Sequence, residues 1–155
     1  MHVVLVEPEI PYNTGNIVRT CAATGTELHL VGPLGFSMSN KYLIRAGLDY
    51  WELAKVHRHR SLEELWEQYP NSVFYYTSKK ASKFYTEVKY NPNDFLVFGK
   101  ETEGLPESLL REKKDYAIRI PMVKEARCLN LSNAVAIVLY EALRQNNFNA
   151  GIQLV

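Results

Sequence analysis

Three polar segments carry residues whose types and spacing could do chemistry, and the first contains Asn13, Gly15, Asn16 and Arg19. On a helix that begins at Asn13, Asn16 and Arg19 are three residues apart and share a face. An arginine beside an asparagine near the end of a strand can bind a phosphate or stabilise a developing oxyanion. The same pattern also fits a capped helix with a solvated polar face, so spacing alone leaves both interpretations open.

The second segment, residues 99–106, follows a continuous apolar run. A buried strand that leads directly into a glycine, here Gly99, indicates that the backbone approaches a ligand closely. Glu101 lies inside the loop, and Gly104 with Pro106 would set its exit into the next helix. An ordinary strand-to-helix loop is the alternative interpretation.

The third segment runs from Ile120 and Met122 through residues 127–134. Asn130, Ser132 and Asn133 can each accept a hydrogen bond from the free N–H groups of a helix N-terminus. Three such residues exceed what one helix start requires, although a well-capped helix explains each of them singly.

Several common motifs are missing from the sequence. No G-x-G-x-x-G follows the first apolar run, which excludes the glycine-rich loop of dinucleotide-binding proteins and of ordinary methyltransferases. Leu105 and Pro106 stand where a P-loop needs lysine and serine or threonine. His57 and His59 could share one face of a strand, but no third ligand is near in sequence, so no metal site is expected.

Composition indicates one domain over residues 1–155, with 46% hydrophobic and 23% charged residues. The net charge of +1 excludes a protein that binds nucleic acid by bulk positive charge, but not one with a local basic patch. Cys21 and Cys128 form no C-x-x-C pair and suit a reducing compartment. No apolar stretch approaches the roughly 18 residues that span a bilayer, and no signal peptide is recognisable. We therefore expect a cytoplasmic protein without a membrane partner.

Apolar runs and capping residues predict the elements that must position these segments. Strands alternating with helices predict an α/β domain with a mainly parallel sheet of five or six strands, flanked by helices. In such sheets ligands bind at the carboxyl ends of the strands. Residues 79–93 remain open between helix, strand and loop. The predicted strands are residues 3–6, 28–31, 53–56, 73–76, 95–98 and 116–120, and the predicted helices are residues 13–24, 41–47, 107–113 and 132–145, with one more that begins after Ser61 in a capping box.

Taken in order, the three segments resemble the motifs of the SPOUT superfamily of S-adenosylmethionine-dependent RNA methyltransferases. The resemblance covers nearly the whole chain. The short length, together with residues 7–11 and 45–50, is similar to the minimal TrmL (YibK/CspR-type) branch. That branch methylates the ribose 2′-hydroxyl of the wobble nucleotide, position 34, of certain tRNAs.

This resemblance implies a C-terminal trefoil knot and a bent cofactor held in it largely by backbone groups. Periodicity shows no knot, and such topologies are rare. The cofactor-binding residues that the resemblance implies are Tyr76, Thr77, Gly99, Glu101, Gly104, Ile120, Met122, Cys128, Leu129 and Asn130.

The resemblance also implies that Arg19 is the catalytic residue. Asn16 would orient Arg19, while Glu101 would pair with it or fix its loop. A guanidinium only donates hydrogen bonds, so we expect Arg19 to bind a phosphate and stabilise the alkoxide rather than act as a base. Ser132 and Asn133 would hydrogen-bond the ribose or cap the helix.

The expected partners are tRNA and a second copy of the chain, because members of the family are homodimers. Lys41, Arg45 and Tyr140 are the candidate substrate-binding residues besides Arg19. Two alternatives stay open, namely 2′-O-methylation of another tRNA or rRNA position and a non-catalytic RNA-binding module of the same fold. Further candidates for a basic RNA-binding surface are Arg58, Arg60, Lys79, Lys80 and Lys83.

Overall fold

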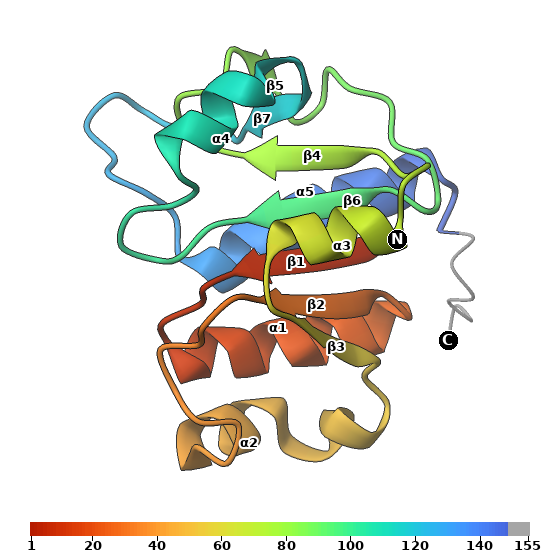
Figure 1. Ribbon diagram of the computed structural model, residues 1–155, viewed down its shortest axis with the longest axis vertical. Helices are drawn as coiled ribbons and strands as arrows, with labels where there is room; N and C mark the ends of the chain where they lie inside the picture. The colour runs from red at the N-terminus through yellow and green to blue at the C-terminus, as the bar shows by residue number, and fades with distance from the viewer. Residues whose placement is uncertain (149–155) are drawn as a thin grey trace.

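Seven strands form the central sheet in the order β3-β2-β1-β6-β4-β7-β5, and every strand pair is parallel (Figure 1). The computed structural model describes residues 1–148, so residues 149–155 of the predicted domain lie outside the described residues. The strands are β1 (His2–Val6), β2 (Glu27–Val31), β3 (Val56–His59), β4 (Phe74–Thr77), β5 (Lys83–Phe84), β6 (Phe95–Phe98) and β7 (Ala117–Arg119). The helices are α1 (Pro11–Thr24), α2 (Lys41–Gly47), α3 (Leu62–Gln68), α4 (Glu107–Glu112) and α5 (Leu131–Gln145), with 3-10 turns η1 (Leu48–Glu52) and η2 (Lys114–Tyr116).

The α/β class and the parallel sheet confirm the prediction, while the strand count of five or six was wrong. The seventh strand is β5, two residues long, which lies in the polar segment 79–93 that sequence left open. The strand predicted at residues 53–56 was also misplaced, because Leu53 is exposed and the strand begins at Val56. The position of β3 is determined by its hydrogen bonds to β2. The residues of β3 contain no continuous apolar run from which the sequence could predict a strand.

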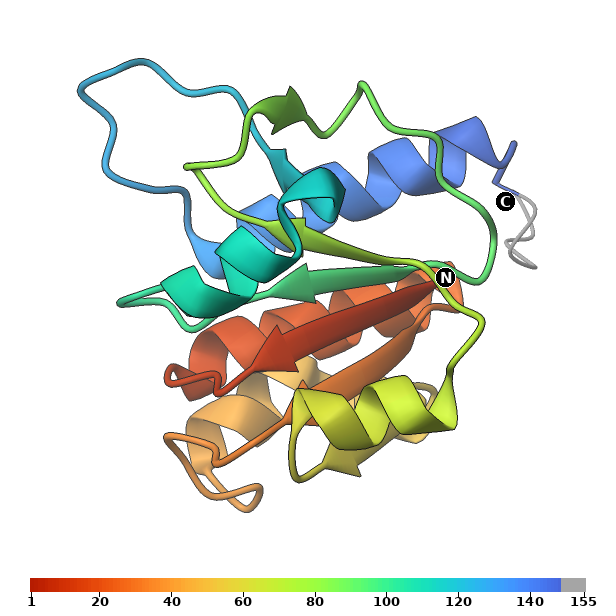
Figure 2. The same ribbon diagram turned by 45° about the horizontal axis from the view of Figure 1, so that its top comes forward.

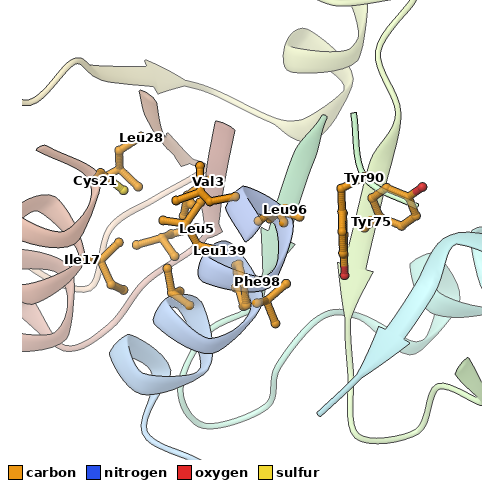
Figure 3. Packing of buried hydrophobic residues seen from close by; sticks show 14 of the residues in the cluster. Val3, Leu5, Ile17, Cys21, Leu28, Tyr75, Tyr90, Leu96, Phe98 and Leu139 are labelled. Carbon is orange, nitrogen blue, oxygen red and sulfur yellow. The ribbon is translucent and has the colours of Figure 1, made fainter. Parts of the chain in front are cut away.

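Side chains alternate between the two faces of the sheet, and a separate core forms on each. On one face α1 and α5 pack against β1, β2 and β6, with Ile17, Cys21 and Leu139 fully buried (Figure 3). On the other face α3 and α4 pack against residues such as Val4 and Phe95. Burial of the Cys21 thiol raises its pKa to about 12, so this cysteine is a packing residue.

The ends of the helices follow local signals in the sequence, with one correction. Ser61 caps α3 by accepting a hydrogen bond from the Glu64 amide, and Gly25 ends α1 in the left-handed conformation, as expected. Helix α1 begins at Pro11 rather than at Asn13, because proline fits the first helical position. The Asn13 side chain is therefore free for another role. Among the residues described, no helix is both long and apolar enough to cross a membrane.

A cluster of histidines lies on the α3 face of the sheet, toward the beginning of β1. Nδ1 of His2 is 3.0 Å from Nε2 of His29, and Nδ1 of His29 is 2.9 Å from Nε2 of His59. Burial lowers the pKa of His2 to about 4 and that of His29 to about 3, against an ordinary value of 6.5. Both imidazoles are therefore neutral at pH 7.

The free energy of unfolding should fall as the pH is lowered from 6.5 towards 4. The folded-state pKa values of His2 and His29 lie below the unfolded value of 6.5, so below that pH the unfolded chain binds protons that the fold excludes. Each imidazole adds a slope of at most about 1.4 kcal/mol per pH unit, and less for His2, which is partly exposed. Urea denaturation of the protein and of His2→Gln across this range measures the contribution. Equal slopes for the two proteins would contradict it.

Candidate active site

The loops that follow β1 and β6 leave the sheet side by side. In the sheet, β1 lies between β2 and β6. After β1 the chain adds β2 and β3 on one side of β1, whereas the later strands lie on the other side, so the order of the strands reverses between β1 and β6. Ligands in open α/β sheets bind at this reversal, outside the carboxyl ends of the strands. The long connection from β7 to α5 stands out from the sheet on the side to which the strand arrows point (Figure 2).

A cavity of about 680 Å³ opens at this point. Four stretches of chain line it, and the start of α1 closes it. The four are residues 77–80, residues 98–105, Ile120 with Met122, and residues 127–131. The sequence-predicted cofactor residues among its lining are Thr77, Gly99, Glu101, Gly104, Ile120, Met122, Cys128, Leu129 and Asn130.

Glu101 fixes the loop after β1 at the rim of this cavity. Its carboxylate accepts hydrogen bonds from the backbone amides of Glu9 and Ile10, at 2.8 and 3.1 Å, and from Nδ2 of Asn13 at 3.1 Å. No ion pair joins Glu101 to Arg19 in the described part of the chain. Of the two roles expected for Glu101, the structure therefore places it in the one that fixes the loop.

Asn13 links the first motif to the third. Its Oδ1 accepts a hydrogen bond from Nδ2 of Asn130 at 2.9 Å, and the residue is 4% exposed. Oδ1 of Asn130 in turn caps α5 by accepting bonds from the amide and the hydroxyl of Ser132. Sequence reasoning assigned Asn13 only as a helix cap, and the surplus of capping residues near Asn130 was the signal that could have revealed this connection.

Two glycines shape the loop after β6, and only one of them does so by close approach. A Cβ on Gly99 would lie 2.1 Å from the carbonyl carbon of Gly104, so Gly99 makes room for the return of its own loop. Gly104 has a φ of +71°, the left-handed region that favours glycine, with open space around its Cα. In the first motif, Gly15 lets α1 approach α2, where a Cβ would lie 2.5 Å from that of Ala46.

The end of β4 contributes one side chain to the cavity and directs another away from it. Thr77 lines the cavity, and its buried Oγ1 has no hydrogen-bond partner among residues 1–148. Tyr76 is buried on the opposite face, among the core residues near α3. The Tyr76 side chain is therefore not part of the lining, because adjacent residues of a strand point to opposite faces. The expected role of Tyr76 in cofactor binding rests on its backbone groups and stays a prediction.

Arg19 lies away from the cavity lining. It is six residues further along α1 than Asn13, which corresponds to about 9 Å of helix. Its guanidinium is exposed and lies 5.1 Å from the ring centre of Tyr50. Asn16 is partly buried, and its backbone carbonyl accepts a hydrogen bond from the Thr20 hydroxyl. Among the described residues, no side-chain hydrogen bond joins Asn16 to Arg19, whose guanidinium contacts Tyr50 instead.

The structure divides the candidate substrate residues among several surfaces. Lys41 and Arg45 are exposed on α2, and Tyr140 is exposed on α5. Asn133 is also exposed, on the first turn of α5. The three lysines of the predicted basic segment lie on neither of these helices. Lys79 and Lys80 line the cavity, and Lys83 donates a hydrogen bond to the Asp115 carbonyl.

Replacing Glu101 with glutamine should destabilise the protein and weaken ligand binding in the cavity. A glutamine amide keeps one acceptor oxygen and places an NH2 group where the other oxygen was. Because Glu9 and Ile10 bond different oxygens of Glu101, one of their two backbone amides then faces a donor and loses its acceptor. We expect a loss of about 1–3 kcal/mol in the free energy of unfolding, measured by urea denaturation. Glu103→Gln is the matched control, because Glu103 lies on the same loop, is 77% exposed and forms an exposed ion pair with Lys100. An equal effect of both substitutions would contradict the role of Glu101.

Known proteins are similar to this chain over most of its length. A family model described as the SpoU rRNA Methylase family matches residues 1–140. The tRNA (cytidine(34)-2'-O)-methyltransferase of Escherichia coli K12 is 46% identical over 154 residues, which cover 98% of this chain and 98% of that protein.

Solved structures share the same fold. A structure from work on 2-OH methylation of C/U34 on tRNA is 41% identical, with a TM-score of 0.90, and the match covers 94% of this chain and 95% of that one. The SpoU methyltransferase AviRb from Streptomyces viridochromogenes, in complex with AdoMet, is 26% identical with a TM-score of 0.84, over 95% of this chain and 58% of that one.

The family match contains all three segments that meet at the cavity, since the third of them ends before residue 140. The chain also spans nearly the full length of the Escherichia coli relative. This chain belongs to the SpoU rRNA methylase family.

Proposed function

We propose that this protein is an S-adenosylmethionine-dependent tRNA methyltransferase that modifies the ribose 2′-hydroxyl of the wobble nucleotide, position 34. The observation that carries the proposal is 46% identity, over 98% of both chains, to the Escherichia coli enzyme named for this reaction. The cavity at the reversal of strand order supports it, because a ligand site is expected there.

The lining of the cavity fits the proposed cofactor. Leu105, Ile120, Met122 and Leu129 offer apolar surface to an adenine ring, and the unpartnered Oγ1 of Thr77 offers a hydrogen bond. Bound there, S-adenosylmethionine would supply a methyl group already activated by its sulfonium. Cys128, exposed and free, lies on the third loop as a small group beside this site.

The remaining work of the protein is to align the ribose hydroxyl and to stabilise charge as it forms. Alignment of two reactants can supply up to roughly 7–11 kcal/mol. Arg19 would bind a phosphate of the RNA and stabilise the developing alkoxide by donating hydrogen bonds, because a guanidinium does not accept a proton. Asn133, exposed at the start of α5, would contact the ribose, whereas the Ser132 hydroxyl is already bonded to Asn130.

The proposed enzyme acts as a homodimer on tRNA. Arg19 and the cavity lie on different parts of one chain, and Tyr12, Ile137 and Tyr140 expose apolar surface on α1 and α5. A second copy packed on these helices would cover that surface and extend the area available to tRNA. Sedimentation tests this directly, and a fully active monomer at working concentration would overturn it.

The proposal includes a cytoplasmic location and a trefoil knot in the C-terminal part of the chain. The likeness to structures of the SpoU family supports the knot. An experimentally traced backbone in which α5 does not pass through a loop would contradict the knot.

One experiment tests the activity and its alternatives together. The purified protein is incubated with methyl-labelled S-adenosylmethionine and total tRNA, and the modified nucleoside is identified and mapped after digestion. We expect one 2′-O-methylated nucleoside at position 34. Label at another tRNA position, or in rRNA when that is supplied, would show that the enzyme methylates a different nucleotide. If calorimetry detects no binding of S-adenosylmethionine, a non-catalytic RNA-binding module is favoured.

A further inference from the structure

All four histidines of the chain lie together on one face of the sheet, far from the cavity. They are His2, His29, His57 and His59. Strand register explains the grouping, since His2 is paired with Glu27 and His29 with His57 on neighbouring strands. Glu27 and His29 are two residues apart on β2 and therefore point to the same face. Sequence reasoning expected no metal here because residues brought together by β1 and β2 are distant in the chain.

We propose that His2, Glu27 and His29 form a binding site for a divalent transition-metal ion, of which Zn²⁺ is the representative. One ligand atom from each residue lies within 4.8 Å of the others. Two imidazole nitrogens and one carboxylate are a ligand set that such ions accept, with positions left for water.

The spacing of the two imidazole nitrogens fits one bound ion. Nδ1 of His2 and Nε2 of His29 are 3.0 Å apart. Zinc–nitrogen bonds of 2.0–2.1 Å place two tetrahedral ligands about 3.3 Å apart, so the rings need to separate by only a few tenths of an ångström. The metal takes the place of the hydrogen between the two rings.

Two of the three ligands, His29 and Glu27, already have a polar outer partner of the kind that metal-binding residues usually have. Nε2 of His59 lies 2.9 Å from Nδ1 of His29, so Nδ1 of His29 has a partner to which it can donate while Nε2 binds the ion. His57 Nε2 contacts the Glu27 carboxylate at 2.9 Å. The His2 ring is stacked on Phe95, with centroids 4.2 Å apart and planes 5° apart, so its orientation is set by packing.

The proposed site is separate from the chemistry of methyl transfer. It lies toward the amino end of β1, whereas the cavity lies beyond the carboxyl ends of the strands. A metal ion here would join β1 to β2 and stabilise the folded state in proportion to its concentration. The role of the ion is therefore structural, and its test does not depend on the proposed function.

The test is a Zn²⁺ titration of the full chain without an affinity tag, after removal of metals with EDTA. Calorimetry at pH 7.5 should show one ion per chain, and Zn²⁺ should raise the melting temperature. His2→Gln and Glu27→Gln should each weaken Zn²⁺ affinity at least tenfold and abolish the rise in melting temperature. Both residues are partly exposed, so these variants should fold. Glu67→Gln, an exposed carboxylate on α3, is the matched control and should bind as the parent does.

A Cu²⁺ probe reads the ligands directly. Electron paramagnetic resonance of the Cu²⁺-loaded protein should show coupling to two nitrogens, and His2→Gln should lose one of them. Zn²⁺ binding that survives unchanged in both variants would place the ion elsewhere, for example at the exposed Cys128, and would overturn the proposal. Failure of the parent protein to bind Zn²⁺ at 100-fold excess would overturn it as well.

Discussion

Replacement of Arg19 with alanine should lower kcat for methyl transfer more than tenfold while leaving cofactor affinity nearly unchanged. The Arg19 side chain is exposed, stacks on Tyr50 and does not line the cavity, so neither the core nor the cofactor site needs it. A guanidinium that binds a phosphate and stabilises an alkoxide acts mainly in the transition state, so its loss lowers kcat. Single-turnover kinetics with saturating tRNA measure the rate, and calorimetry measures cofactor binding.

Two further variants separate the charge of Arg19 from its geometry. Arg19→Lys keeps the charge but lacks the planar fork that binds a phosphate through two hydrogen bonds, so we expect an intermediate rate. Arg144→Ala removes an exposed arginine near the end of α5, which pairs with Glu141, and should leave the rate near that of the parent. If Arg19→Ala retains more than about a tenth of the parent kcat, a loss below 1.4 kcal/mol, the assigned role is wrong.

The sequence predicts the elements of this fold best where one strand or helix carries its own signal. Apolar runs predict β1, β2, β4 and β6, and capping residues predict α3. The signal fails for β3 and β5, because β3 depends on pairing with β2 and β5 consists of only two residues that pair with β7. Neither pairing leaves a periodic pattern in the strand itself.

The candidate site was predictable as a set of loops but not as a set of contacts. Glycines and asparagines mark the segments that meet at the cavity, which is lined by most of the predicted cofactor residues. The chain of contacts from Glu101 through Asn13 to Asn130 joins residues at separations of 88 and 117 positions. These residues come together only because of the order of the parallel strands in the sheet. The spacing of residues within any one segment of the sequence does not predict this order.

Replacement of Gly99 with valine should abolish cofactor binding. A Cβ at this position would lie 2.1 Å from the carbonyl carbon of Gly104 and 2.2 Å from the amide nitrogen of Leu105. Both are backbone atoms that cannot rotate away, so the loop after β6 must move and the cavity must change shape. Calorimetry with S-adenosylmethionine measures binding, and thermal unfolding shows whether the variant is folded.

Gly104→Ala is the matched control for the position of the added side chain. No atom lies within 4 Å of a Cβ at Gly104, but its φ of +71° makes alanine unfavourable there. We expect Gly104→Ala to lose about 1–2 kcal/mol of stability and to weaken cofactor binding less than Gly99→Val does. Because the cavity depends on the return of the loop past Gly99, a folded Gly99→Val protein that binds with unchanged affinity would place the adenosine site elsewhere on the chain.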